Sequence, residues 1–197
     1  MILPNQLTTL RIILTPIFAY LFISDNPELK KISLIIFLIA ALTDWYDGWL
    51  ARKLNYFTDF GRFMDPLADK ILTTTAFFCF VYLGILELWM VLIIAIRDIF
   101  VTLLRSIGEY YGEHFITTKV AKWKTAFQMI FLYYILILYV LHLQPFAKNY
   151  KNIFDILLNE KFIYYFMLLI TLLTLYTGIH YFVRNRTLFS KIYKKLI

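Results

Sequence analysis

Six apolar runs, each close to the roughly 20 residues that cross a bilayer as a helix, constrain the fold of this chain more than any other feature. They cover residues 7–23, 32–51, 65–85, 88–108, 123–143 and 162–183. Hydrophobic residues make up 61% of the 197 positions, whereas a soluble domain has about 45–50%. We therefore expect an all-α integral membrane protein with six transmembrane helices, forming one domain over residues 1–197.

The positions of lysine and arginine predict the orientation. Six spans place both termini on one side of the membrane, and short cytosolic connections carry an excess of basic residues. If the termini are cytosolic, all but five of the 20 basic residues fall on the cytosolic side; the exceptions are Lys30, Lys31, Lys148, Lys151 and Lys161. The sequence therefore predicts an N-in, C-in topology.

The segment 44–70, DWYDGWLARKLNYFTDFGRFMDPLADK, interrupts the apolar pattern with regularly spaced carboxylates. Asp44 and Asp47 are three residues apart, and Asp65 and Asp69 are four apart, so each pair shares one helix face. In the predicted topology both pairs lie at the cytosolic helix ends. Charged side chains at membrane depth usually face a cavity. We therefore expect a polar cavity that opens to the cytosol.

Four carboxylates in one small volume repel each other unless cations neutralise them. Oxygen ligands without nearby His or Cys favour Mg²⁺ or Mn²⁺ over Zn²⁺. Four are enough for two ions about 3.5–4 Å apart, the separation used in phosphoryl chemistry. Gly48, Ala51 and Gly61 are small residues near these acids; they allow either close approach of a ligand or close helix packing.

The spacing of this segment resembles the signature of the CDP-alcohol phosphotransferases, with every fixed position present. The matching pattern is Asp44-x2-Asp47-Gly48-x2-Ala51-Arg52-x8-Gly61-x3-Asp65-x3-Asp69. The resemblance implies six transmembrane helices, a homodimer and dependence on Mg²⁺ or Mn²⁺. It also implies an enzyme that moves a phosphatidyl or similar group from a CDP-linked donor to an alcohol and releases CMP.

Shorter segments narrow the acceptor. PNQLTTLRIILTPIF, DPLADKIL, IRDIFVTLLR, KVAKWKTAFQM and TGIHYF are similar to segments of the bacterial phosphatidylglycerophosphate synthases. Asp98 stands where that pattern has Glu, and Ala121 where it has Gly. The resemblance implies CDP-diacylglycerol as donor, glycerol 3-phosphate as acceptor and the bacterial cytoplasmic membrane as location. Inositol phosphate, serine or phosphatidylglycerol as acceptor remain alternatives.

The resemblance also implies roles for the signature residues. Asp44, Asp47 and Asp65 are expected to bind metal, and Asp69 to be both a metal ligand and the general base. A carboxylate beside the cations can take the proton that the acceptor hydroxyl loses as it attacks phosphorus. The CDP-donor site is expected to be formed by Asp47, Gly48, Ala51, Arg52 and Gly61.

Three basic residues are candidates for binding a phosphate on the acceptor: Arg97, Arg105 and Lys122. They lack an equal number of nearby acids, and a phosphate group would supply charge-assisted hydrogen bonds. The alternatives are an ion pair between Arg97 and Asp98, and a Lys122 side chain that extends to the membrane surface. The net charge of +7 indicates that the chain binds anionic lipid headgroups or phosphorylated substrates, and not nucleic acid.

A divalent-cation transporter is the alternative from another functional class. Transporters place their binding sites near the bilayer midplane, often between inverted repeats. Here the four aspartates are expected near the cytosolic face of the membrane, and the sequence shows no internal repeat. The sequence therefore favours the enzyme.

Overall fold

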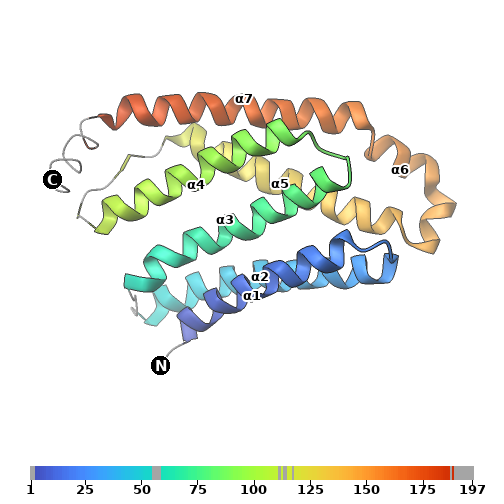
Figure 1. Ribbon diagram of the computed structural model, residues 1–197, viewed down its shortest axis with the longest axis horizontal. Coiled ribbons are helices and arrows are strands. Elements are labelled where there is room, and N and C mark those ends of the chain that lie inside the picture. Colours follow the sequence, from blue (N-terminus) through green and yellow to red (C-terminus); the bar gives the residue numbers. More distant parts are fainter. Residues whose placement is uncertain are drawn as a thin grey trace.

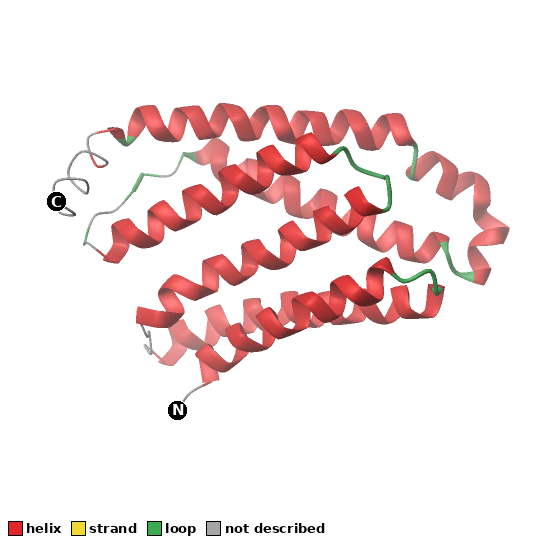
Figure 2. Ribbon diagram, in the orientation of Figure 1, coloured by secondary structure: helices red, strands yellow, loops and turns green. Residues whose placement is uncertain are grey.

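The computed structural model describes residues 3–54, 59–110, 112, 115–116, 118–186 and 188, and these residues form helices and turns without a strand (Figure 2). The elements are α1 (Leu3–Ile23), α2 (Pro27–Leu54), α3 (Asp59–Tyr82), α4 (Leu88–Tyr110), α5 (Lys119–His142), the 3-10 helix η1 (Pro145–Tyr150), α6 (Lys151–Leu157) and α7 (Glu160–Arg184). The all-α prediction is confirmed.

Side chains cap the free backbone N–H groups at the start of three of the long helices, α2, α5 and α7. Asn26 accepts a 2.9 Å hydrogen bond from the backbone N–H of Glu28, with Pro27 as the first residue of α2. Thr118 and Asn159 cap α5 and α7 in the same way. Because caps and not hydrophobicity set these starts, α2 begins five residues before the predicted span at 32–51. α3 begins at Asp59, six residues before the predicted start at 65.

The six long helices run back and forth beside one another (Figure 1). The beginnings of α1, α3 and α5 and the ends of α2, α4 and α7 lie at the same end of the bundle; we call this the motif end. The opposite, distal end carries the α1–α2 and α3–α4 connections and α6. α1 packs on α2 and α3, while α7 packs on α4 and α5.

A core of aromatic side chains joins α1, α2 and α3. The ring of Phe18 lies 5.4 Å from that of Phe22 and 5.1 Å from that of Phe37, and Phe22 lies 5.2 Å from Phe80. All four side chains are completely buried. Such ring pairs add to the free energy gained from apolar burial. This part of the interior is therefore packed with aromatic rings, and a polar group buried beside it needs a hydrogen-bond partner.

The outer faces of the bundle are also apolar. Tyr20 is 78% exposed, Ile179 67% and Ile96 66%, from three different helices. Within the described residues, α5 and α7 are long and apolar enough to cross a membrane, and Thr8–Ile23 forms a shorter apolar helix. Extended exposed apolar surface marks contact with a membrane or another protein. These features are those of a membrane protein.

Candidate functional site

The structure places all four predicted metal-binding aspartates on helices. Asp65 and Asp69 lie one turn apart on α3, and both are partly buried. Asp44 and Asp47 lie on the continuous helical backbone of α2, so their backbone keeps the spacing that puts them on one face. Gly48, Ala51 and Arg52 on α2 and Gly61 on α3 are also helical. The side-chain positions of these α2 residues lie outside the described part of the structure.

A residue of α1 forms a hydrogen bond with the carboxylate of Asp65. The hydroxyl of Thr8 donates a hydrogen bond to Oδ1 of Asp65, and Thr8 is only 1% exposed. Thr8 was not among the residues named from the sequence. The sequence feature that could have indicated Thr8 is a polar stripe within an apolar run: Thr8, Arg11 and Thr15 recur at helical spacing. In the structure all three are buried.

Asp69 lies among charged and polar groups of α3 and of other helices. Nζ of Lys70 lies 3.5 Å from its Oδ2. Asp69 also lines a cavity of about 50 Å³ with Arg11 of α1 and Tyr133 of α5. Arg11 is buried, and its Nε donates a 3.4 Å hydrogen bond to the carbonyl of Ala40 on α2. Four helices thus meet around the second acid of α3.

A second charged cluster joins α4 and α5. Oδ1 of Asp98 accepts hydrogen bonds from Nζ of Lys124 at 2.6 Å and from Nη1 of Arg97 at 3.0 Å. The Lys124 side chain is 0% exposed and that of Asp98 3%, whereas that of Arg97 is 14% exposed. A Cβ atom on Gly178 would lie 3.3 Å from Cγ of Arg97, so α7 approaches this arginine closely. The ion pair between Arg97 and Asp98, one of the alternatives for Arg97, is present.

The three predicted phosphate-binding bases do not share one environment. Arg97 lies in the buried cluster, whereas Arg105 is half exposed and lies 3.9 Å from Glu109. Lys122 is exposed. Lys124, which was not predicted as a site residue, faces the interior from α5. Lys124 shares one buried face of α5 with Gln128, Phe131 and Ile135, and a residue two positions away lies on another face; local sequence gave no signal for this.

Lys70 connects Asp69 electrostatically with the cluster of Asp98. The charge of Lys70 interacts with both Asp98 and Lys124, while Lys70 also contacts Asp69. The described residues contain no group of three or more His, Cys, Asp or Glu arranged to hold a metal. Asp65 and Asp69 nevertheless offer only oxygen atoms, which fit a hard divalent cation.

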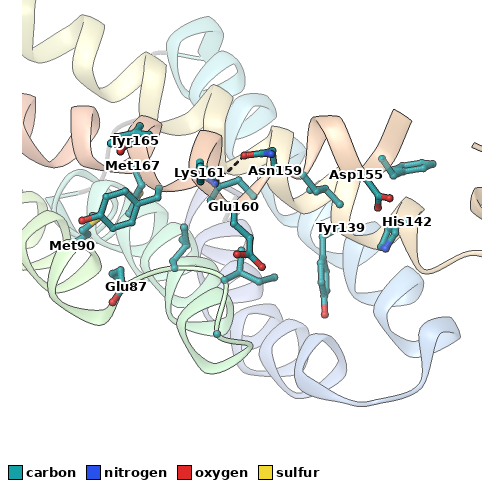
Figure 3. Close-up of a pocket in the computed structure, with 17 residues that line it drawn as sticks. Glu87, Met90, Tyr139, His142, Asp155, Asn159, Glu160, Lys161, Tyr165 and Met167 are labelled. Carbon is teal, nitrogen blue, oxygen red and sulfur yellow. Dashed lines mark hydrogen bonds between the residues drawn. The ribbon is translucent and has the colours of Figure 1, made fainter. Parts of the chain in front are cut away.

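A cavity of about 780 Å³ lies at the distal end, away from these acids (Figure 3). Met90 and Met167 are buried in its wall, while Glu87, Glu160 and Lys161 are exposed at it. Figure 3 shows these side chains together with Tyr139 and His142 of α5. This is not the predicted cavity at the motif end, parts of which lie outside the described residues.

Comparison with known families gives one match along most of the chain. The family model described as CDP-alcohol phosphatidyltransferase matches residues 1–183. The match begins before α1 and ends one residue short of the end of α7. It therefore includes both the aspartate segment and the Asp98 cluster.

Curated relatives share one name, CDP-diacylglycerol–glycerol-3-phosphate 3-phosphatidyltransferase. The protein of Bacillus subtilis (strain 168) is 39% identical over 140 residues, which cover 65% of this chain and 72% of the relative. That of Wigglesworthia glossinidia brevipalpis is 37% identical over 140 residues, covering 68% and 76%. That of Rickettsia typhi is 34% identical over 130 residues, covering 66% and 73%.

Proposed function

The chain belongs to the CDP-alcohol phosphatidyltransferase family, and we propose that it transfers the phosphatidyl group of CDP-diacylglycerol to glycerol 3-phosphate. The products are CMP and phosphatidylglycerophosphate, a step of phospholipid biosynthesis. The observation that carries this function is the family match over residues 1–183, together with relatives that share one substrate pair in their names.

The six long helices cross the bacterial cytoplasmic membrane as one domain over residues 1–197, with both termini in the cytosol. Three observations support this arrangement: the alternating direction of the helices, the exposed apolar side chains on their outer faces and the excess of basic residues at the motif end. The motif end then faces the cytosol, where water-soluble acceptors and released CMP are found. Membrane lipids surround the bundle, and a second copy of the chain completes a homodimer.

Asp44, Asp47, Asp65 and Asp69 would hold two divalent cations, Mg²⁺ or Mn²⁺. The all-oxygen donor set and the hydrogen bond from Thr8 to Asp65 support this assignment. When bound, such cations neutralise the charge of the diphosphate and of the leaving CMP. The donor itself is bound by Asp47, Gly48, Ala51, Arg52 and Gly61.

Asp69 is the catalytic base. As the acceptor hydroxyl oxygen forms its bond to the β-phosphorus, a carboxylate oxygen of Asp69 takes the hydroxyl proton, and the bond from phosphorus to the CMP oxygen breaks. Lys70 beside Asp69 holds one oxygen of this carboxylate in place. The acceptor phosphate is bound by Arg97, Arg105 and Lys122, whose charges exceed those of the acids they contact.

The test is an acceptor panel. Purified protein in mixed micelles with CDP-diacylglycerol is supplied separately with labelled glycerol 3-phosphate, inositol phosphate, serine or phosphatidylglycerol, and Asp69→Asn serves as the blank. We expect CMP release and labelled lipid with glycerol 3-phosphate. A labelled lipid with another acceptor only would overturn the assignment. Divalent-cation flux into sealed vesicles without lipid product would support the transporter instead.

A further inference from the structure

We propose that Asp98 and Lys124 together position Arg97 for the acceptor and leave its positive charge available to the acceptor phosphate. Arg97 is the most exposed member of this cluster: 14% of its side chain is exposed, against 3% for Asp98 and 0% for Lys124. Asp98 and Lys124 are buried and act through Arg97. The inference rests on the proposed function and adds two positioning residues to its acceptor site.

The geometry gives Asp98 two cationic partners on a single oxygen atom. Oδ1 accepts from Lys124 Nζ at 2.6 Å and from Arg97 Nη1 at 3.0 Å. Oδ2 of Asp98 is buried and has no hydrogen-bond partner among the described residues. The carboxylate thus holds two bases that come from different helices, and this fixes the guanidinium of Arg97 relative to α5.

The charges in this cluster do not cancel. Asp98 supplies one negative charge, while Arg97 and Lys124 supply two positive ones. Lys70 interacts with the cluster from α3, but its charge is shared with Asp69, 3.5 Å away. A surplus positive charge in a buried site is costly unless an anion completes it. A phosphate group on the acceptor is such an anion.

Lys124 has a defined part in this arrangement. If Asp98 paired with Arg97 alone, the two charges would offset each other and Arg97 would attract a phosphate weakly. Nζ of Lys124 lies closer to the Asp98 carboxylate than the guanidinium of Arg97 does. The buried lysine therefore offsets the negative charge of Asp98, and the charge of Arg97 stays available. Gly178 on α7 leaves room for the Arg97 side chain, because a Cβ there would approach Cγ to 3.3 Å. Arg97 is therefore held on two sides.

A double-mutant cycle tests the inference. Lys124→Met and Asp98→Asn are each expected to raise the KM for glycerol 3-phosphate about 10- to 100-fold, with the KM for CDP-diacylglycerol changed less than about threefold. In the single Asp98→Asn variant, Arg97 and Lys124 repel each other and compete for the amide oxygen that the substitution introduces. In the double variant the competing cation is gone, so Arg97 can donate to this oxygen and again carries one unopposed charge. Its KM for glycerol 3-phosphate is expected to lie below that of either single variant.

Control variants distinguish a failure of the inference from a loss of folding and from a failure of the proposed function. Glu28→Gln removes the carboxylate of an exposed ion pair at the distal end, Lys31 with Glu28 at 3.7 Å, and should leave both KM values unchanged. The double variant removes two buried charges and is expected to fold even if Asp98→Asn does not. Independent, multiplicative effects of the two substitutions, or equal increases in both KM values, overturn the inference. A wild-type protein that does not use glycerol 3-phosphate instead overturns the proposed function.

Discussion

The hydroxyl of Thr8 on α1 donates a hydrogen bond to the carboxylate of Asp65 on α3, 57 positions away in the sequence. A hydroxyl donor fixes the orientation of the carboxylate it contacts, and groups that orient metal ligands contribute strongly to metal affinity. Through this bond α1, which carries none of the predicted metal ligands, helps to shape the site.

Removing this hydroxyl should weaken metal binding. Thr8→Ala is expected to raise the Mn²⁺ concentration for half-saturation about 10- to 100-fold, whereas Thr8→Ser keeps the hydroxyl and should stay close to wild type. Manganese binding followed by electron paramagnetic resonance measures this without turnover. The matched control is Thr9→Ala, the neighbouring exposed threonine. Equal affinities of Thr8→Ala and wild type would show that Thr8 does not orient the site.

Metal removal should stop the reaction. EDTA is expected to abolish transfer, and added Mg²⁺ or Mn²⁺ to restore it, because four carboxylates cannot bind a diphosphate without cations. Asp44→Asn, Asp47→Asn and Asp65→Asn should each lose nearly all turnover, while the elution volume in size-exclusion chromatography stays the same. Full activity in a chelated sample would contradict the metal assignment.

Replacing Asp69 should abolish the transfer step without abolishing binding of the donor. Asp69→Asn is expected to abolish transfer and still bind CDP-diacylglycerol within about tenfold of wild type, because the other three acids keep the diphosphate site. Equilibrium binding of labelled CDP-diacylglycerol and single-turnover kinetics measure the two effects. If donor binding is lost together with turnover, Asp69 is a binding residue and the base lies elsewhere.

The predicted orientation can be read from chemical labelling. In a Cys79→Ala background, Tyr56→Cys, between α2 and α3 in the sequence, should react with an impermeant maleimide only from the cytosolic side. Asn149→Cys, in η1 at the distal end, should react only from outside. Both variants must first retain activity. The reverse pattern of labelling would place the aspartates on the outer face of the membrane.

The close approach at Gly178 gives a graded test of the Arg97 position. Gly178→Ala adds a Cβ 3.3 Å from Arg97 Cγ, which a small shift can relieve, so a change of about twofold or less in the KM for glycerol 3-phosphate is expected. Gly178→Val overfills the contact and should raise this KM about tenfold. Ile179→Ala, on the exposed side of α7, is the control. Unchanged kinetics in Gly178→Val would show that Arg97 does not depend on this contact.

The helices and the identity of the aspartate segment could be predicted from the sequence, because both depend on local spacing. Apolar runs of bilayer length predicted the long helices, and intervals of three and four residues predicted which acids share a face. The starts of α2 and α3 differed from the predicted spans: Asn26 caps α2 before its apolar run, and α3 begins at Asp59, before its apolar run.

Which side chain of a helix faces a partner was decided only by the tertiary structure. Lys122 and Lys124 are indistinguishable in local sequence, yet packing of α5 against α2, α3 and α7 turns Lys124 inward to Asp98 and leaves Lys122 exposed. The contact between Thr8 and Asp65 likewise needs α1 to pack against α3. The sequence alone determines a helix and its faces, because the backbone hydrogen bonds of a helix are local. Which faces pair is decided by the packing of all the helices together, because that packing determines which side chains are buried between helices and which remain on the outer surface.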